Sequence, residues 1–401
     1  MLGTADQTRQ AIPQALVDAD FDMFALKVPD GDAQIVWTEV RDTHPPIFWT
    51  NQNGGHWVFT RADDIEAAQK DHEHFSMREG AIPKGRRGIP SPPIDVDPPR
   101  HFAYRAVLSP AFSPKAVAAL ETVTRSVLLE AIDKVIDKGE CEFVSEIAHV
   151  LPITVFLKMM GLPLEDAKVL LPLSHQNTQA KELVDTQAAR AGMVRYIIDK
   201  IEDRRASPGS DVLSHVVHSK VDGQPIAEQD LLGMCALLLA GGLDTVASML
   251  GFFARFLALN PGHREDLVAN PDRIPKAIDE LIRRHGVANT ARIMTADYNY
   301  KGVLLRKDDM VLVPNCLHGL DPQQVNMPLE VDFDRPPPIP SAAFGNGPHR
   351  CPGIALARME MKVFLQEWLK RIPEFRIKSG TTPVATIGAT NSMQELWLSW
   401  G

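Results

Sequence analysis

A lone cysteine, Cys351, lies at the end of a glycine-rich loop and directly before a predicted helix. The loop reads Phe344-Gly345-Asn346-Gly347-Pro348-His349-Arg350-Cys351-Pro352-Gly353. A helix N-terminus supplies unpaired N–H groups and positive potential, which favour a thiolate over a thiol. The glycines let the backbone pass close to a flat ligand. The pattern predicts a metal-binding thiolate, and the alternative is a buried, inert cysteine.

An acid and a hydroxyl interrupt the most apolar stretch of the chain, in Ala240-Gly241-Gly242-Leu243-Asp244-Thr245. Polar groups inside an apolar helix are costly unless they find partners. Helical spacing places Gly241 one turn before Asp244 and Thr245, on the same face. We expect a pocket for a small polar ligand here, and the Thr245 hydroxyl could bond the Gly241 carbonyl and loosen the helix. The alternative is a helix–helix contact with Asp244 in a salt bridge.

Charged residues recur at helical spacing elsewhere. Glu280 and Arg283 are three residues apart and so share one side of a helix, although such pairs are often only surface ion pairs. His101 and Arg105 are four apart on another predicted helix, and Arg292 lies in a predicted strand. By their spacing alone, these three cations could be ordinary surface charges.

Helices would carry most of these residues. The apolar spacing predicts helices within residues 115–205, over 227–259 and 272–284, and from about 353 to just before Pro373. Asp97 is predicted to cap a helix that has Pro98 and Pro99 in its first turn. Residues 78–99 predict a long binding loop, and residues 318–350 an irregular segment.

Strands would be few and short. Residues 35–37 and 56–60 flank a polar, glycine-rich turn and predict a small antiparallel sheet, and residues 292–315 predict further short strands. Residues 1–30 are expected to form a loose N-terminal arm. The sequence therefore predicts a mainly α protein with small peripheral sheets.

The composition sets outer limits on function. The chain has 401 residues, 44% of them hydrophobic and 23% charged, which is enough for a large core. A net charge of −9 argues against nucleic acid as the main partner. The four cysteines form no CxxC pair and fit a reducing compartment. The apolar run before Asp244 is shorter than the ~18 residues of a membrane span, so we expect a soluble, cytoplasmic protein without membrane contact.

The cysteine loop and the Asp–Thr segment together resemble the cytochrome P450 family, and within it the soluble bacterial camphor hydroxylase group. All six fixed positions of the family loop F-G-x-G-x-H/R-x-C-x-G match, and so does the motif A/G-G-x-D/E-T. The resemblance runs from about residue 30 to the end. It implies the family fold, a helical triangular prism with small sheets and a buried haem b, as a single domain over residues 31–401.

The resemblance also implies roles for residues. Cys351 would be the iron ligand, Thr245 a catalytic hydrogen-bond donor to bound dioxygen, and Asp244 the catalytic gate of a proton relay. Residues expected to contact the haem are His101, Arg105, Ala240, Gly241, Arg292, Phe344, Gly345, His349, Cys351 and Gly353. Expected substrate contacts are Leu237, Ala240, Gly241, Asp244, Thr245, Val287, Asn289 and Thr390. Glu280, Arg283 and Arg335 would form a structural set.

The implied activity is insertion of one atom of O2 into a C–H bond of a small apolar molecule. Electrons would come from a two-iron ferredoxin and its NAD(P)H-dependent reductase, and a basic cluster of Arg105, Arg350, Arg358 and Lys362 would receive the ferredoxin. A peroxide-driven haem-thiolate enzyme and a non-catalytic haem sensor are the alternatives. The intact Asp244–Thr245 pair counts against the peroxide-driven enzyme, because peroxide needs no relay of protons to dioxygen.

Two departures from the group bear on substrate. The group holds camphor through a tyrosine hydroxyl in the loop before the Asp-Pro-Pro segment, but this chain has no tyrosine before Tyr104 and offers Ile82, Ile89 and Ile94 instead. An acid that the family places near a haem propionate is Thr290 here. We therefore expect a cyclic terpenoid or norisoprenoid, ionone-like rather than camphor, by analogy with the group.

Overall fold

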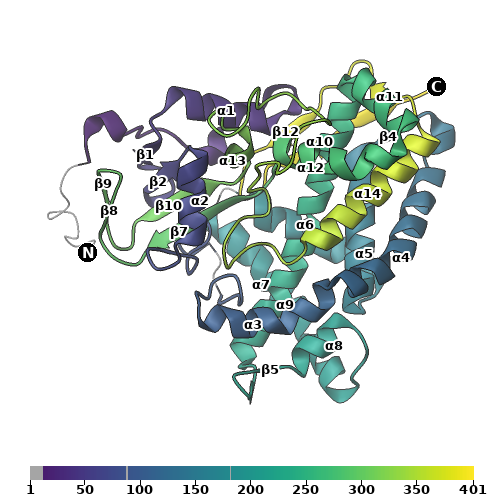
Figure 1. The fold of residues 1–401 in the computed structure, drawn as a ribbon. Coiled ribbons are helices and arrows are strands. Elements are labelled where there is room, and N and C mark those ends of the chain that lie inside the picture. The colour runs from purple at the N-terminus through teal and green to yellow at the C-terminus, as the bar shows by residue number, and fades with distance from the viewer. Residues whose placement is uncertain (1–11, 87–88, 181) are drawn as a thin grey trace.

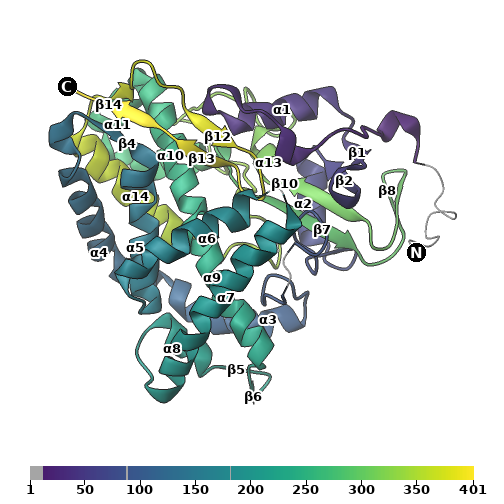
Figure 2. The same cartoon turned by 180° about the vertical axis from the view of Figure 1, so that it is seen from behind.

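Helices form most of the computed structural model, which describes residues 12–86, 89–180 and 182–401 (Figure 1). The outline is broad along one edge and narrows towards α8, as Figures 1 and 2 show. The predicted mainly α fold is confirmed. The α-helices are α1 (Ala33–Thr43), α2 (Ala62–Lys70), α3 (Arg100–Leu108), α4 (Pro114–Asp133), α5 (Val150–Met160), α6 (Ala167–Gln179), α7 (Leu183–Ala206), α8 (Val212–Val217), α9 (Glu228–Leu243), α10 (Thr245–Leu259), α11 (Pro261–Ala269), α12 (Ile274–Arg284), α13 (Cys316–Leu320) and α14 (Ile354–Arg371).

The largest sheet has five strands in the order β1-β2-β10-β7-β3, with β10 parallel to β2 and the other pairs antiparallel. The predicted strands within residues 292–315 are confirmed and begin slightly earlier. The strands of this sheet are β1 (Ile47–Thr50), β2 (His56–Phe59), β3 (Phe75–Ser76), β7 (Asn289–Met294) and β10 (Met310–Pro314). The remaining, smaller sheets are formed by β4 (Glu140–Glu142), β11 (Arg376–Ile377) and β14 (Trp397–Ser399), by β12 (Val384–Thr386) and β13 (Ser392–Glu395), by β5 (Lys220–Val221) and β6 (Gln224–Pro225), and by β8 (Tyr298–Tyr300) and β9 (Val303–Leu305).

The predicted strand at residues 35–37 is wrong, because these residues lie in α1. The Asp32 carboxylate accepts a hydrogen bond from the N–H of Ile35 and caps that helix. Val36, Trp37 and Val40 share a helical face and are buried. The antiparallel partner of β2 is β1 instead.

The predicted loose arm is also wrong over its described part, residues 12–30. Phe21, Met23 and Phe24 are buried, and the N–H of Asp18 bonds to the carbonyl of Trp49 in β1. Apolar side chains that follow a polar start have been drawn into the core. Residues 1–11 lie outside the described part of the chain.

The predicted side-chain cap of α3 by Asp97 is wrong. Its carboxylate accepts from the N–H of Met77 at 3.0 Å and from the hydroxyl of Ser76. The helix begins at Arg100, after Pro99. Asp97 therefore ties the loop before α3 to the residue after β3.

The predicted long helix over 227–259 is present but is interrupted at Asp244, which separates α9 from α10. Together these helices, Glu228–Leu259, are the one part of the described chain long and apolar enough to cross a membrane. Of the most apolar window, 71% is buried inside the protein, as in a core helix. α6 and α7 pack on α9, and α14 packs on α10; Figures 1 and 2 show α14 and the α6–α7 pair on opposite faces.

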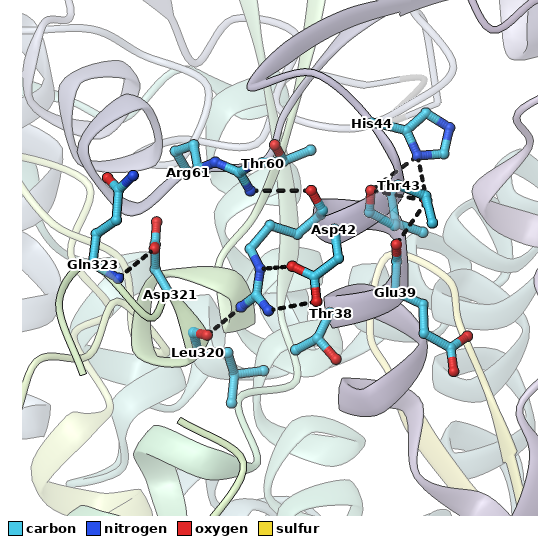
Figure 3. Close-up of polar contacts among 12 residues, drawn as sticks. Thr38, Glu39, Asp42, Thr43, His44, Thr60, Arg61, Leu320, Asp321 and Gln323 are labelled. Atoms are coloured by element: carbon cyan, nitrogen blue, oxygen red, sulfur yellow. Dashed lines mark hydrogen bonds and ion pairs between the residues drawn. The ribbon is translucent and has the colours of Figure 1, made fainter. Parts of the chain in front are cut away.

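The short helix α13 is held by hydrogen bonds to three other helices, two of them from arginine side chains. Arg41 of α1 donates to the carbonyl of Leu320 and pairs with Asp42; both partners are labelled in Figure 3. Asp321 accepts from the N–H of Ala62 at the start of α2. Arg283 of α12 donates to the carbonyl of Gly319 at 2.7 Å. The carbonyl groups at the end of α13 therefore accept hydrogen bonds from arginines. These bonds fix the position of α13 and of Asn315, the residue that precedes it.

The described parts of the loop before α3, residues 77–86 and 89–96, pack on α7 and α9. Arg190 of α7, which is buried, donates to the hydroxyl of Ser91 at 2.6 Å. A Cβ atom built on Gly233 of α9 would lie 1.8 Å from the carbonyl oxygen of Pro90. Only glycine permits this close approach of the loop backbone to the helix.

Candidate functional site

A cavity of about 320 Å³ lies between the α9–α10 pair and the cysteine loop. Such a volume is typical of sites for small organic molecules. The structure brings most of the residues predicted from the motifs together around it. Predicted residues that line the cavity are His101, Arg105, Leu237, Gly241, Thr245, Val287, Arg292, Phe344, Gly345, His349, Cys351 and Gly353.

The loop that presents Cys351 depends on two left-handed glycines. Gly345 and Gly347 have φ values of 70° and 67°, which other residues rarely adopt. The N–H of Cys351 donates to the carbonyl of Phe344 at 2.9 Å, closing the loop. A Cβ on Gly347 would come within 2.5 Å of the carbonyl of Gln69, so the loop rests on the end of α2.

Burial raises the pKa of the Cys351 thiol, while the N–H of Gly353 and the charges of Arg105 and Arg350 lower it. The sequence predicted that the helix N-terminus would favour a thiolate. The N–H contact is present, but burial outweighs it. A metal ion coordinated by the sulfur would remove the thiol proton.

The charge around the cavity fits a flat cofactor that carries carboxylates. His101, Arg105, Arg292 and His349 line it, and Glu360 is the one acid among the described lining residues. Burial raises the pKa of Glu360 to about 8, so this acid is largely neutral at pH 7. Burial also lowers the pKa of His349 to about 4, and the Asp97 carboxylate, whose Oδ1 lies 3.6 Å from His349 Nε2, opposes that shift. Arg105 and Arg292 therefore bring positive charge to a lining whose one described acid is largely neutral, which suits an anionic group.

Both ring nitrogens of His101 lie within hydrogen-bond distance of backbone carbonyl oxygens. Nδ1 lies 2.9 Å from the carbonyl of Pro93, and Nε2 lies 3.0 Å from that of Pro348. Arg105 donates to the carbonyl of Arg350 at 2.5 Å. These side chains therefore also join α3 to the loops on either side of the cavity.

Thr245 faces the cavity and Asp244 does not. The Thr245 hydroxyl donates to the carbonyl of Gly241 at 3.2 Å, the bond expected from their spacing. A Cβ on Gly241 would meet no atom within 4 Å, so the helix leaves open space beside the hydroxyl. Asp244 is 1% exposed. Burial lowers the pKa of His149, at the start of α5, and the negative charge of Asp244 opposes that shift.

Glu280, Arg283 and Arg335 meet in a buried cluster apart from the cavity. Arg283 donates to both carboxylate oxygens of Glu280, at 2.8 and 2.7 Å. Arg335 donates to the same oxygens at 3.0 Å. Burial would raise the pKa of Glu280, but the bonds from Arg283, the Asp332 N–H and Arg335 hold it below its ordinary value. The carboxylate thus joins α12 to the irregular segment that leads into the cysteine loop.

Three further residues predicted to contact substrate or haem do not line the cavity. Asn289 turns its amide to the carbonyl of Gly388 and to Asn391, at 2.8 Å each. Side chains alternate along a strand, so Thr290 and Arg292 of β7 cannot share the face of Asn289. Ala240 is buried beside Gly241, and Thr390 is buried in a backbone bridge with Ala288.

Amide side chains at the cavity were missed by the sequence reasoning. Gln69, Asn315 and Asn346 line it, next to Thr290. They come from the end of α2, the residue before α13 and the cysteine loop. Amides are common in any sequence, so only Thr290, at a position where the family has an acid, offered a signal.

Comparisons with known proteins agree on one family. Residues 118–390 match the family model described as Cytochrome P450. The "Probable cytochrome P450 127A1" of Sinorhizobium fredii is 35% identical over 97% of this chain and 96% of its own length. Among solved structures, CYP101J2 superposes with a TM-score of 0.89 at 34% identity over 98% of this chain and 100% of its own. CYP101C1 gives 0.88 at 35% identity over 97% and 98%.

Proposed function

The chain belongs to the cytochrome P450 family and is a haem b-dependent monooxygenase, and from that premise we propose that it hydroxylates a small, apolar cyclic terpenoid or norisoprenoid. An ionone-like molecule suits the cavity better than camphor. Electrons would come from a two-iron ferredoxin and its NAD(P)H-dependent reductase, and the protein would be soluble and cytoplasmic.

The lining of the cavity is the observation that carries this proposal. Apolar side chains from the loop before α3 and from the residues before β7 face it, namely Met77, Pro93, Ile94, Val287 and Ala288, with Leu237 of α9. No tyrosine lies among the described lining residues, so no phenol is present to orient a ketone. A substrate would be held by shape and by buried apolar area. This favours a molecule whose length and ring fix its pose without a strong hydrogen bond.

Four side chains fit the cofactor's anionic groups and one fits its iron. Cys351 is the proposed iron ligand, and His101, Arg105, Arg292 and His349 are the proposed propionate contacts. Phe344, Gly345 and Gly353 would flank the cysteine side, and Gly241 would leave room on the opposite side. When bound, haem b supplies the activation of O2, and a thiolate ligand favours cleavage of the O–O bond.

The Asp244–Thr245 pair is proposed to handle protons. Thr245 offers a hydroxyl to the cavity, and Asp244 is the adjacent buried carboxyl to which we assign the proton relay. A positioned acid–base pair of this kind typically contributes roughly 100- to 10,000-fold to a rate. Both groups lie at the break between α9 and α10.

A binding screen with purified ferric protein tests the substrate class. Ionones and related norisoprenoids should produce the absorption change that accompanies loss of the water on iron, at lower concentrations than camphor does. Tighter binding of camphor would contradict the proposal. The reduced carbon monoxide complex should absorb where thiolate-ligated haem does, and the spectrum of a histidine-ligated haem would reject Cys351 as the ligand.

Turnover separates the monooxygenase from its alternatives. Product should form with ferredoxin, reductase and NADH, and only weakly with peroxide alone. Efficient turnover by peroxide without the ferredoxin system would favour the peroxide-driven enzyme. Haem that binds these ligands but consumes no reductant would indicate a sensor.

A further inference from the structure

Two segments that lie far apart in the sequence meet at one wall of the cavity. Residues 286–289 run into the start of β7, and residues 388–391 run up to β13. Val287 and Ala288 of the first segment line the cavity. Thr390 of the second segment forms an antiparallel backbone bridge with Ala288. The second segment therefore supports the wall that the first segment forms.

Two buried asparagines join the segments with their side chains. Asn289 Nδ2 donates to the carbonyl of Gly388 and to Asn391 Oδ1, at 2.8 Å each. Asn391 Nδ2 donates to the carbonyl of Gly286 at 3.4 Å. The exposed fractions of Asn289 and Asn391 are 6% and 0%. Such bonds resist breaking, because a buried amide that loses its partner keeps the full cost of its lost hydration.

Hydrogen bonds hold three consecutive carbonyl groups of the wall. The carbonyl of Gly286 accepts from Asn391 Nδ2. That of Val287 accepts from the N–H of Asn391 at 2.7 Å. That of Ala288 accepts from the N–H of Asn315, the residue before α13, at 3.1 Å. The backbone of the wall therefore has little freedom to move away from a ligand.

An aromatic side chain of α1 fixes the asparagine pair to the core. Trp37 Nε1 donates to Asn391 Oδ1 at 3.1 Å, and Trp37 is fully buried. This oxygen accepts from both Trp37 and Asn289, while the Asn391 nitrogen donates to Gly286. The Asn391 amide is thus held at both its acceptor and its donor end.

We propose that Asn289 and Asn391 are positioning residues that set the size of the ligand that the cavity accepts. Neither belongs to the described lining of the cavity, and both act through the backbone of Val287 and Ala288. A bulky ligand must displace this wall, and each hydrogen bond between the segments raises the cost of the displacement. A small ligand that does not reach the wall is unaffected.

The inference rests on the proposed role of this cavity as the ligand site beside the haem iron. It does not rest on the terpenoid class, so a failure of ionones to bind would leave it standing. Azoles that bind ferric haem iron are therefore suitable probes. Imidazole is small, and clotrimazole carries a bulky triaryl group on the same ring.

Asn289→Leu removes the amide but keeps a side chain of similar size. In this variant clotrimazole should bind roughly fivefold more tightly, relative to imidazole, than in the wild type, the factor expected for the loss of about one net hydrogen bond from the wall. Both affinities are measured by absorption titration of the purified ferric holoenzyme. An unchanged ratio of the two affinities, or an equal change in both, would overturn the proposal.

A control variant separates this effect from a general loss of stability. Asn260 is a half-buried asparagine at the end of α10 whose Nδ2 donates to the carbonyl of Phe256 at 2.8 Å, and it does not belong to the described lining of the cavity. Asn260→Leu should leave the ratio of azole affinities unchanged. A change as large as that in Asn289→Leu would overturn the proposal.

Hydrogen exchange in the wild type provides a test that needs no variant to fold. Peptides covering residues 286–291 should exchange faster with clotrimazole bound than with imidazole bound, because the bulky ligand strains the hydrogen bonds across the wall. Equal exchange in the two complexes would show that the wall does not limit ligand size, and would overturn the proposal.

Discussion

The Thr245 hydroxyl shows how one side chain can serve both a helix and a ligand. Its bond to the Gly241 carbonyl, at 3.2 Å, is longer than the usual 2.5–3.0 Å of O–H···O bonds. A long bond is weak, so the hydroxyl can turn into the cavity at little cost. The open space at Gly241 leaves room for whatever the hydroxyl then meets.

Thr245→Ala should therefore separate binding from chemistry. Substrate affinity should stay near that of the wild type, because the hydroxyl is proposed to act on oxygen and not on an apolar substrate. Product formed per NADH consumed should fall several-fold, with the remainder appearing as peroxide or water. Thr245→Ser keeps the hydroxyl and should retain most of the coupling. Unchanged coupling in the alanine variant would remove Thr245 from the mechanism.

Buried ion pairs join helices that are distant in the sequence, and Asp32 forms the clearest example. Its carboxylate caps α1 and also pairs with Arg284 of α12 at 2.8 Å and Arg255 of α10 at 3.4 Å. Burial would raise the pKa of Asp32, but Arg284 and the other positive charges around it hold the value at about 2. Because this is below the ordinary value of 3.8, the ionised form stabilises the fold.

The contribution of Asp32 should vanish in acid. The depressed pKa supplies roughly 2 kcal/mol that is fully present above about pH 4 and is lost as the pH falls towards 2. Asp32→Asn should lower the apparent Tm of the holoenzyme by several degrees at pH 7 and by progressively less from about pH 5 to about pH 3. Asp42→Asn, which removes an exposed carboxylate that pairs with the buried Arg41, should cost under about 1 kcal/mol, because the carboxylate is open to solvent. A Tm deficit in Asp32→Asn that does not shrink with falling pH would contradict this account.

Local motifs in the sequence singled out Cys351 and Thr245, because each motif combines particular residue types with a fixed spacing, and both residues line the cavity. The same reasoning paired Glu280 with Arg283, and these two residues meet in a buried cluster apart from the cavity. The amides at the cavity could not be predicted, since Gln69, Asn315 and Asn346 come from distant segments and meet only in the fold. Asn289 was misplaced because a strand's sequence does not reveal which of its two faces is turned to the cavity. The apolar triple at residues 35–37 fits a strand or a helix equally, and the Asp32 cap decides for the helix.

At the scale of the whole molecule, the cysteine side is the surface to consider for a protein partner. A groove beside the cysteine loop is lined by Lys276, Arg335, Arg350 and Arg358, with Asp279 as its one acid in the described chain. Arg358 is paired with that aspartate, and Lys362 with Glu121 at 2.8 Å. Arg350 is exposed and forms no salt bridge within the described residues. Of the basic cluster expected from the sequence, Arg350 therefore keeps the most charge available for an acidic partner.

Charge-reversal variants should show how much each basic position contributes to electron transfer from the ferredoxin. Arg350→Glu should lower the rate of electron transfer from an acidic ferredoxin roughly tenfold at low ionic strength and weaken its salt dependence. Lys362→Glu should act less, because Glu121 already neutralises that lysine. Lys307→Glu, an exposed site between β9 and β10, should change nothing. Substrate affinity should stay constant throughout, and equal rates for wild type and Arg350→Glu in low salt would place docking elsewhere.

The Pro90 carbonyl packs directly against Gly233 of α9, where glycine has only a hydrogen atom in place of a side chain. Gly233→Ala would insert a methyl group as a wedge, since its Cβ would lie 1.8 Å from that oxygen. The loop amides of residues 89–96 should then exchange their hydrogens faster, and ligands should enter and leave more quickly in stopped-flow traces. Gly262→Ala, where an added Cβ meets nothing within 4 Å, should do neither. Ligand access to the cavity could thus be increased without changing any side chain that contacts the ligand. Unchanged hydrogen exchange in Gly233→Ala would show that this loop does not control ligand access.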